Sequence, residues 1–203
     1  MKRFYDNYGN FVGFSRLPMG AVSFYQALQR KSFGRYPALP WIPFRAISVL
    51  SKLCRKDWKV VEIGGGMSTL WLSERCGHVT TIEASEAWYQ KLSELLSERK
   101  ITNVHLRYEP RGDRMCDFAG IDNAVLDLLV IDGGPRESCL ARGFSKVRSS
   151  GWVYLDNWDV PAFWTGSSEF LAAKSGELAS STRFTDYVPG SFCVNTGLLL
   201  QKR

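Results

Sequence analysis

The sequence predicts a doubly wound α/β fold whose mostly parallel, seven-stranded sheet is closed by an antiparallel hairpin. Apolar runs of strand length, rich in the branched residues that strands favour, alternate with segments of helical apolar spacing over residues 59–157. The last two apolar runs follow one another with only a turn-like segment between them, which indicates the hairpin. Such alternation implies right-handed crossovers that place helices on both faces of the sheet.

The expected elements follow one another in a regular order. Strands are expected at residues 59–64, 78–84, 103–109, 127–133, 151–157, 183–188 and 195–201. Helices are expected between the first five strands at 68–75, 85–100, 115–124 and 136–149, and before the hairpin at 168–179. A helix at 44–54 is expected to pack beside the first strand.

The length of 203 residues suits one domain with an appendage. Residues 1–40 are aromatic and irregular apart from an amphipathic stretch at 21–31, and we expect them to form a cap or lid on a main domain at 41–203. No apolar run approaches the roughly 20 residues of a membrane helix, and the first residues lack the apolar centre of a signal peptide. We therefore expect no membrane insertion and a cytoplasmic location.

Charge and cysteine content narrow the function classes. The net charge of +6 permits contact with nucleic acid, but lysines and arginines are spread along the chain rather than gathered in a block. A nucleic-acid partner is therefore not expected, while association into a homo-oligomer stays open. The five cysteines are odd in number and include no CxxC pair, so reduced thiols are expected and neither a disulfide framework nor a zinc site.

Three consecutive glycines mark the turn after the first strand. In open α/β sheets, ligands bind beyond the carboxyl ends of the strands where the strand order reverses, and this turn should lie there. Gly64, Gly65 and Gly66 let the backbone bend and let a ligand approach it, and a helix starting near Ser68 offers free amides. The loop lacks the Lys-Ser/Thr of a P-loop, and Thr69 stands where the dinucleotide fingerprint has its third glycine.

A carboxylate ends the second expected strand. Glu83 follows the run "HVTTI", where it can accept hydrogen bonds from both hydroxyls of a ribose. Taken alone, the glycines could merely form a tight turn and Glu83 could merely be solvated. Together they favour an adenosine-containing ligand.

These motifs resemble those of the class I S-adenosylmethionine (SAM)-dependent methyltransferases. "VVEIGGGMST" is similar to that family's first motif, "TTIEA" to its second and "DLLVIDGG" to its fourth. The family's fold is a Rossmann-like methyltransferase fold with an antiparallel last strand, and the resemblance implies SAM as cofactor. It implies a cofactor-binding set of Glu62, Gly64, Gly65, Gly66, Ser68, Glu83, Ala84 and Asp132, with Tyr108 and Asp113 as further candidates near the adenine.

A second group of polar residues ends the fourth and fifth strands. Asp132, Asp156 and Asn157 should lie on adjacent strands about 5 Å apart. Carboxylate and amide oxygens suit a hard cation, above all Mg²⁺. The pattern resembles the magnesium site of the cation-dependent, catechol-type O-methyltransferases, but it has Arg136 where that group has a lysine. Arg136 could attract an anionic acceptor, or Asp132 could act as the base without a metal; Asp156 or Asn157 could instead cap a helix.

The resemblance implies transfer of a methyl group from SAM to an oxygen of a small-molecule acceptor, with Asp132, Asp156 and Asn157 as the catalytic residues. N-methylation of RNA or protein, an NAD-dependent reductase and a non-catalytic binding domain remain alternatives. Six aromatic residues could line an acceptor pocket or fill a core: Tyr5, Tyr8, Phe11, Phe14, Trp41 and Trp164.

Overall fold

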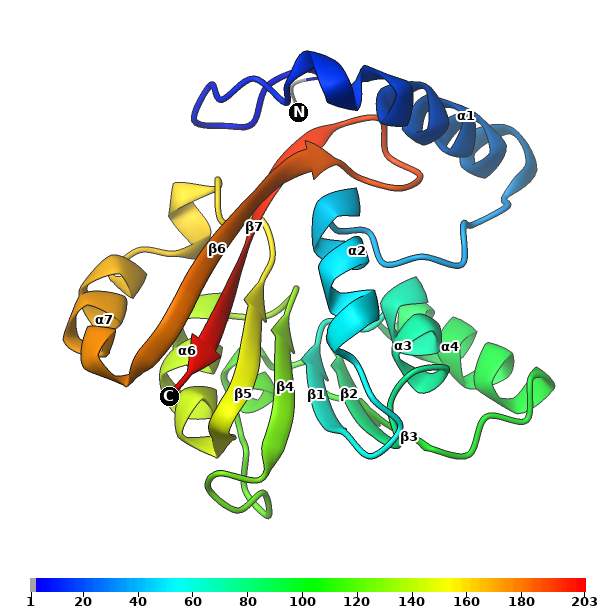
Figure 1. Ribbon diagram of the computed structural model, residues 1–203. Coiled ribbons are helices and arrows are strands. Elements are labelled where there is room, and N and C mark those ends of the chain that lie inside the picture. Colours follow the sequence, from blue (N-terminus) through cyan, green and yellow to red (C-terminus); the bar gives the residue numbers. More distant parts are fainter. Residues whose placement is uncertain (1–2) are drawn as a thin grey trace.

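One mixed sheet forms the centre of the molecule (Figure 1). The structure is a computed structural model that describes residues 3–203. Within these residues the sheet has seven strands: β1 (Lys59–Ile63), β2 (His78–Glu83), β3 (Val104–Tyr108), β4 (Leu126–Ile131), β5 (Val147–Leu155), β6 (Leu178–Tyr187) and β7 (Val194–Lys202). Their order is β3-β2-β1-β4-β5-β7-β6; the first five are parallel, and β7 runs antiparallel to β5 and β6. The predicted fold class is confirmed, including the closing hairpin.

The strand order reverses at β1. This strand pairs with β2 on one side and with β4 on the other. Chain segments that leave β1 and β4 therefore head toward opposite halves of the sheet, and in open α/β sheets this switch point is where a ligand crevice forms. The loop of residues 64–66 directly follows β1, so it lies at the predicted place.

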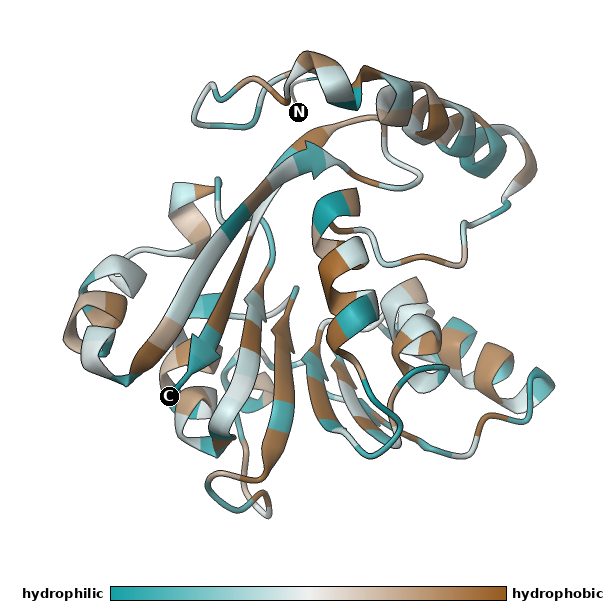
Figure 2. Cartoon of the chain, viewed as in Figure 1, coloured by the Kyte–Doolittle hydropathy of each residue, from teal (hydrophilic) through white to brown (hydrophobic). Residues whose placement is uncertain are grey.

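Helices cover both faces of the sheet (Figure 1). One face carries α2 (Phe44–Leu53), α3 (Met67–Ser73) and α4 (Glu86–Glu98), and the other carries α5 (Gly112–Met115), α6 (Arg136–Gly143) and α7 (Ser167–Ala173). Val60 and Leu128 pack toward the first layer, whereas their neighbours Val61 and Leu129 pack toward the second. Because both faces are covered, the central strands are mainly apolar, as Figure 2 shows for most of β4, in which Asp127 is the one polar residue.

Three of the expected helices differ from the prediction. The helix at 115–124 is wrong: α5 ends at Met115, and the chain then turns because the Asp117 carboxylate accepts a hydrogen bond from the Ala119 amide and Gly120 adopts a φ of +80°. The helices at 136–149 and 168–179 end early. Each passes through a 3₁₀ turn, η2 (Phe144–Lys146) or η4 (Ser175–Glu177), into a strand.

The segment before α2 lies across the β6–β7 end of the sheet (Figure 1). It contains η1 (Phe14–Arg16) and α1 (Leu17–Phe33). Arg16 forms a salt bridge of 2.5 Å with the buried Asp186 of β6, and the Ser23 hydroxyl donates to the Val188 carbonyl at 2.6 Å. These contacts attach α1 to the hairpin. Across residues 3–203, every helix is too short or too polar to span a lipid bilayer.

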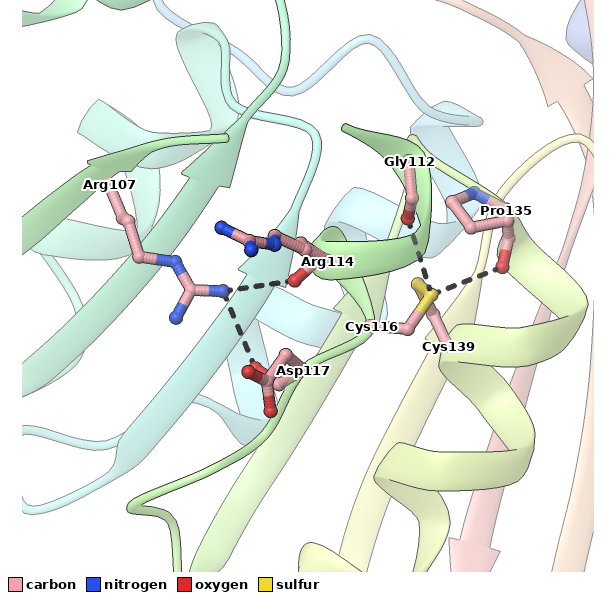
Figure 3. The surroundings of a disulfide bond; sticks show 7 residues. All are labelled: Arg107, Gly112, Arg114, Cys116, Asp117, Pro135 and Cys139. Carbon is pink, nitrogen blue, oxygen red and sulfur yellow. Dashed lines mark hydrogen bonds between the residues drawn. A yellow bond between two sulfur atoms is a disulfide. The ribbon is translucent and has the colours of Figure 1, made fainter. Parts of the chain in front are cut away.

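A disulfide links the two sides of the α5–α6 region (Figure 3). It joins Cys116, just after α5, to Cys139 in α6, with a Cα–Cα distance of 4.6 Å. The expectation that all cysteines are reduced is therefore wrong for this pair. The sequence could not reveal the pairing because the two cysteines are 23 positions apart along the chain, with all of β4 between them. Cys54, Cys76 and Cys193 are free thiols, as expected.

Candidate functional site

A cleft of about 310 Å³ opens at the carboxyl ends of the parallel strands. Its walls come from the loops after β1, β4 and β5, from the start of α4, from the β6–β7 turn and from Trp41. The lining residues are Trp41, Gly65, Gly66, Met67, Ser68, Trp88, Asp132, Asp156, Asn157, Val188, Ser191, Cys193 and Asn195. The cleft thus gathers all three residues predicted to be catalytic and part of the predicted cofactor loop.

The three glycines of the loop have three different environments. Gly64 has a φ of +89°, and a Cβ there would lie 2.8 Å from the Gly133 amide nitrogen of the loop after β4. A Cβ on Gly65 would lie 2.7 Å from the Thr81 methyl group in the sheet. Gly66 has room for a side chain, since the nearest heavy atom to its added Cβ, Ser68 Oγ, is at an ordinary contact distance of 3.8 Å. The missing Cβ of Gly64 and Gly65 is thus required by close packing within the protein. At Gly66 packing does not require a glycine, so there the missing Cβ leaves room in the cleft.

Glu83 braces the glycine loop. Its Oε2 accepts a hydrogen bond of 2.6 Å from the Gly65 amide, and its Oε1 accepts one of 2.6 Å from the Ser85 amide at the start of α4. The side chain is almost buried and does not itself line the cleft. Each oxygen keeps a further lone pair for a second donor. Glu83 therefore holds the loop in place and retains the capacity to accept ligand hydroxyls.

Glu62 lies behind the cleft rather than in its wall. It is fully buried, and its Oε2 accepts hydrogen bonds from the hydroxyls of Thr69 at 2.6 Å and Thr81 at 2.7 Å. Its Oε1 finds no hydrogen-bond donor among the described residues. Burial raises the pKa of Glu62 above its ordinary value. This carboxylate fixes the start of α3 to β1 and β2, and it has one oxygen left to accept from a donor.

Two carboxyl groups with perturbed pKa values face each other across the ends of β4 and β5. Burial, together with the neighbouring Asp156 carboxylate, raises the pKa of Asp132 well above its usual range. Burial raises the pKa of Asp156 to about 6, although the Arg136 guanidinium and the Tyr154 hydroxyl, 3.0 Å from Oδ1, act in the opposite direction. The pair therefore retains a proton at a pH where an ordinary aspartate has lost it, which suits a group that exchanges a proton with a bound acceptor.

The residue that links this pair is Arg136, the first residue of α6. Its Nη1 donates to the Asp156 carbonyl and to Asn157 Oδ1, both at 2.8 Å. Its Nη2 donates to the Asp132 carbonyl at 2.8 Å and to Asp132 Oδ1 at 3.4 Å. The side chain is 9% exposed. Arg136 is thus fully engaged by the protein, which opposes the prediction that it attracts an anionic acceptor.

The helix-capping alternative for Asp156 and Asn157 is wrong. The next helical turn, η3 (Pro161–Phe163), begins after Val160 and has no side-chain cap. Trp158, which follows Asn157, is buried in the core, with its ring 5.2 Å from the ring of Trp164. Asn157 adopts a φ of +50°, a conformation that asparagine tolerates better than most residues, and this turn aims its side chain at Arg136.

The candidate magnesium ligands do not fit a metal site as they are arranged. Asn157 Oδ1 and Asp132 Oδ1 both accept hydrogen bonds from a guanidinium, and Asp156 Oδ1 accepts from Tyr154. A divalent ion placed among them would lie against a permanent positive charge. Over residues 3–203, moreover, no three His, Cys, Asp or Glu side chains come together in a way that could hold a metal ion.

Sequence reasoning missed the residues that close the cleft from two sides. Trp88 in the first turn of α4 forms one wall, with its ring 5.6 Å from that of Trp41. Ser191, Cys193 and Asn195 come from the β6–β7 turn and the start of β7. The sequence does carry a signal for Trp88, because it follows Glu83 by five residues and so falls in the first turn of the helix beside the predicted site. The residues of the β6–β7 turn carry no such signal.

Other candidates lie away from the cleft. Ala84 packs against the core, Tyr108 packs on the Tyr89 ring at 5.4 Å, and Asp113 is exposed in α5. Of the six candidate acceptor-pocket aromatics, Trp41 lines the cleft and Trp164 is in the core. The other four are exposed on the N-terminal segment: Tyr5, Tyr8, Phe11 and Phe14.

Solved structures share this fold at low sequence identity. TomG from Streptomyces achromogenes, an O-methyltransferase involved in tomaymycin synthesis and crystallised with SAM, has a TM-score of 0.64 and 18% identity, over 94% of this chain and 96% of its own. A candidate O-methyltransferase from Klebsiella pneumoniae has a TM-score of 0.64 and 19% identity, over 93% of this chain and 99% of its own. The tRNA methyltransferase TrmI from Aquifex aeolicus has a TM-score of 0.55 and 17% identity, over 83% and 70%.

No protein-family model and no curated protein matches the sequence. The structural matches nevertheless place the chain in one fold class. It has the fold of the class I SAM-dependent methyltransferases, and the resemblance read from the motifs is confirmed at that level.

Proposed function

We propose that the protein transfers a methyl group from SAM to an oxygen of a small or medium-sized acceptor. The observation that carries this proposal is the cleft, which joins a glycine loop braced by Glu83 to two carboxyl groups of raised pKa, Asp132 and Asp156. It lies at the switch point of a fold shared with TomG, an O-methyltransferase crystallised with SAM.

The residues present fit SAM. Gly66 leaves an open backbone surface beside the start of α3, and both Glu83 oxygens retain acceptor capacity next to it. The acid pair in the cleft wall, Asp132 and Asp156, favours a ligand that carries positive charge. The aromatic walls that Trp41 and Trp88 give the cleft also suit the adenosine part.

The chemistry then follows from position and charge. Bound SAM supplies a methyl group on a sulfonium, which an oxygen nucleophile attacks in line. Asp132 orients the acceptor hydroxyl and accepts its proton, a task for which a raised pKa is suited. Burial and the neighbouring Asp156 carboxyl group, which accepts a hydrogen bond from Tyr154, raise the pKa of Asp132. Asn157 accepts a hydrogen bond from Arg136 and so helps to hold the guanidinium beside both aspartates.

Two alternatives have less support. N-methylation of RNA or protein is the reaction class of neighbours such as TrmI, but a cleft roofed by Trp41 and the β6–β7 turn favours a small acceptor. A non-catalytic binding domain would need no perturbed acid pair.

We further propose that residues 1–40 act as a lid on the acceptor side, because α1 is attached to the hairpin whose turn lines the cleft.

The first test is a calorimetric titration of the purified chain with SAM, with NADH as the competing ligand. We expect one-to-one binding of SAM alone. Glu83→Ala should weaken that binding by about 1–3 kcal/mol, because two half-buried amides lose their acceptor and the glycine loop is no longer held in place. Glu86→Ala, an exposed glutamate three residues further on at the start of α4, is the matched control and should leave SAM binding unchanged. Binding of NADH alone would reject the proposal.

Turnover is the second test. An acceptor screen with isotope-labelled methyl groups should detect transfer to oxygen, and Asp132→Asn should lower turnover far more than it lowers SAM affinity. Equal losses of turnover and affinity would contradict the role of Asp132. SAM binding without transfer to any acceptor would favour the binding-domain alternative.

A further inference from the structure

The oxygens that the sequence pattern offers to a divalent ion are contacted here by a side chain of the protein itself. Four of the five N–H groups of the Arg136 guanidinium donate to oxygens at the ends of β4 and β5. Two of these acceptors, Asp132 Oδ1 and Asn157 Oδ1, belong to the residues that the sequence pattern offers as metal ligands. The cation and the ligand oxygens are therefore already paired within the chain.

Backbone carbonyls, an aromatic ring and a disulfide-anchored helix together fix the position of the guanidinium. The backbone carbonyls of Asp132 and Asp156 receive two of its hydrogen bonds, so its place is tied to both strand ends and not only to their side chains. The Phe163 ring lies over it, 4.4 Å from Cζ to the ring centroid. Arg136 begins α6, and Cys139 of the same helix is anchored by the disulfide to Cys116. The Arg136 side chain therefore has little freedom to move away from the ends of β4 and β5.

We propose that Arg136 is the resident cation of this site and that the site binds no divalent metal ion. An arginine side chain carries a permanent positive charge in proteins, so Arg136 supplies a fixed positive charge beside Asp132 and Asp156 without requiring a bound ion. Arg136 is a positioning residue: it orients Asp132 at the cleft wall and joins the ends of β4 and β5. The proposal rests on the proposed function only in that it makes methyl transfer independent of Mg²⁺.

Metal binding can be measured without SAM or an acceptor. The test is a titration of the full chain with Mn²⁺, followed by the loss of the free-ion signal in electron paramagnetic resonance. For the wild-type protein we expect no site tighter than about 1 mM, the weak end of protein sites for hard cations. Arg136→Met removes the guanidinium and keeps most of its length, so it should create a Mn²⁺ site. Arg142→Met, at an exposed position of the same helix, should not.

Two results would overturn the proposal. One is a stoichiometric Mn²⁺ site in the wild-type protein that Asp132→Asn removes. The other is a folded Arg136→Met protein that gains no Mn²⁺ binding. If Arg136→Met does not fold, Arg136→Lys keeps a positive charge and should likewise bind no Mn²⁺, and the thermal midpoint of the wild-type protein in MgCl₂ should equal that in NaCl of the same ionic strength.

A parallel SAM titration separates the two proposals. SAM should bind equally well in EDTA and in MgCl₂. If SAM does not bind in either buffer, the proposed function fails, while the Mn²⁺ result still decides the role of Arg136. If SAM binds only when Mg²⁺ is present, the role proposed for Arg136 fails and the proposed function stands.

Discussion

Gly64 and Gly66 are two residues apart, yet alanine should affect them in different ways. At Gly64, φ is +89°, and an added Cβ would lie 2.8 Å from the Gly133 nitrogen and 2.9 Å from its Cα. Both are backbone atoms of a packed loop, so no flexible side chain can move aside. At Gly66 the backbone is extended, and the nearest heavy atom, Ser68 Oγ, would be 3.8 Å from the Cβ.

The magnitudes follow from these contacts. A left-handed conformation costs a residue with a Cβ about 1–2 kcal/mol, and overpacking costs about 1–3 kcal/mol. Gly64→Ala should therefore lower the free energy of unfolding by about 2–5 kcal/mol. Gly66→Ala should change it by less than about 0.5 kcal/mol, as substitutions away from packed features do. Its methyl group projects into the cleft, however, so SAM affinity should fall by about tenfold or more, or about 1.4 kcal/mol.

Urea denaturation of both variants gives the stabilities, and calorimetry gives the SAM affinities. If Gly64→Ala unfolds within about 0.5 kcal/mol of the wild-type protein, the close approach of the loops after β1 and β4 does not explain this glycine. If Gly66→Ala binds SAM as tightly as the wild-type protein does, the cofactor does not lie against this part of the loop.

Two further predictions concern the acid pair and the disulfide. Because the folded-state pKa of Asp156 is raised from 3.8 to about 6, ionisation of this group destabilises the fold increasingly between these two pH values and fully above the upper one. Asp156→Asn should thus raise the free energy of unfolding by up to about 3 kcal/mol at pH 8 and by almost nothing at pH 4. Urea denaturation between pH 4 and pH 8 measures this difference. A gain in stability that does not depend on pH would contradict the reasoning. Cys116→Ser should lower the free energy of unfolding by about 3 kcal/mol under non-reducing conditions, as expected for a closed loop of 23 residues. Cys54→Ser is the control, and equal stability of both variants would argue against the Cys116–Cys139 bond.

The strand and helix order could be predicted because it depends on local patterns. Each of the seven expected strands overlaps an observed one, since apolar runs such as Leu126–Ile131 are long and uninterrupted. The helix expected at 115–124 failed because its apolar residues Met115, Phe118 and Ile121 reach the core from a chain that is irregular after α5. Periodicity alone cannot separate a helix from an irregular segment whose apolar side chains are buried at similar intervals.

For the candidate site, the sequence predicts where the residues lie but not which hydrogen bonds they form. The carboxyl ends of parallel strands meet at one edge of a sheet, so the sequence by itself placed the glycine loop, Glu83, Asp132 and Asp156 at that edge. It could not determine what each oxygen accepts. Asn157 and Arg136 are 21 residues apart, and their hydrogen bond exists only because β4 and β5 pair side by side.

The tertiary structure alone decided which groups complete the site. Cys116 meets Cys139, the β6–β7 turn lines the cleft, and Arg136 of α6 reaches the ends of β4 and β5 because these elements pack against the same sheet. These contacts join segments far apart in the sequence, and their formation depends on packing and on the pairing of buried charges. Local sequence patterns encode neither, whereas they do encode the alternation of strands and helices from which the sheet is built.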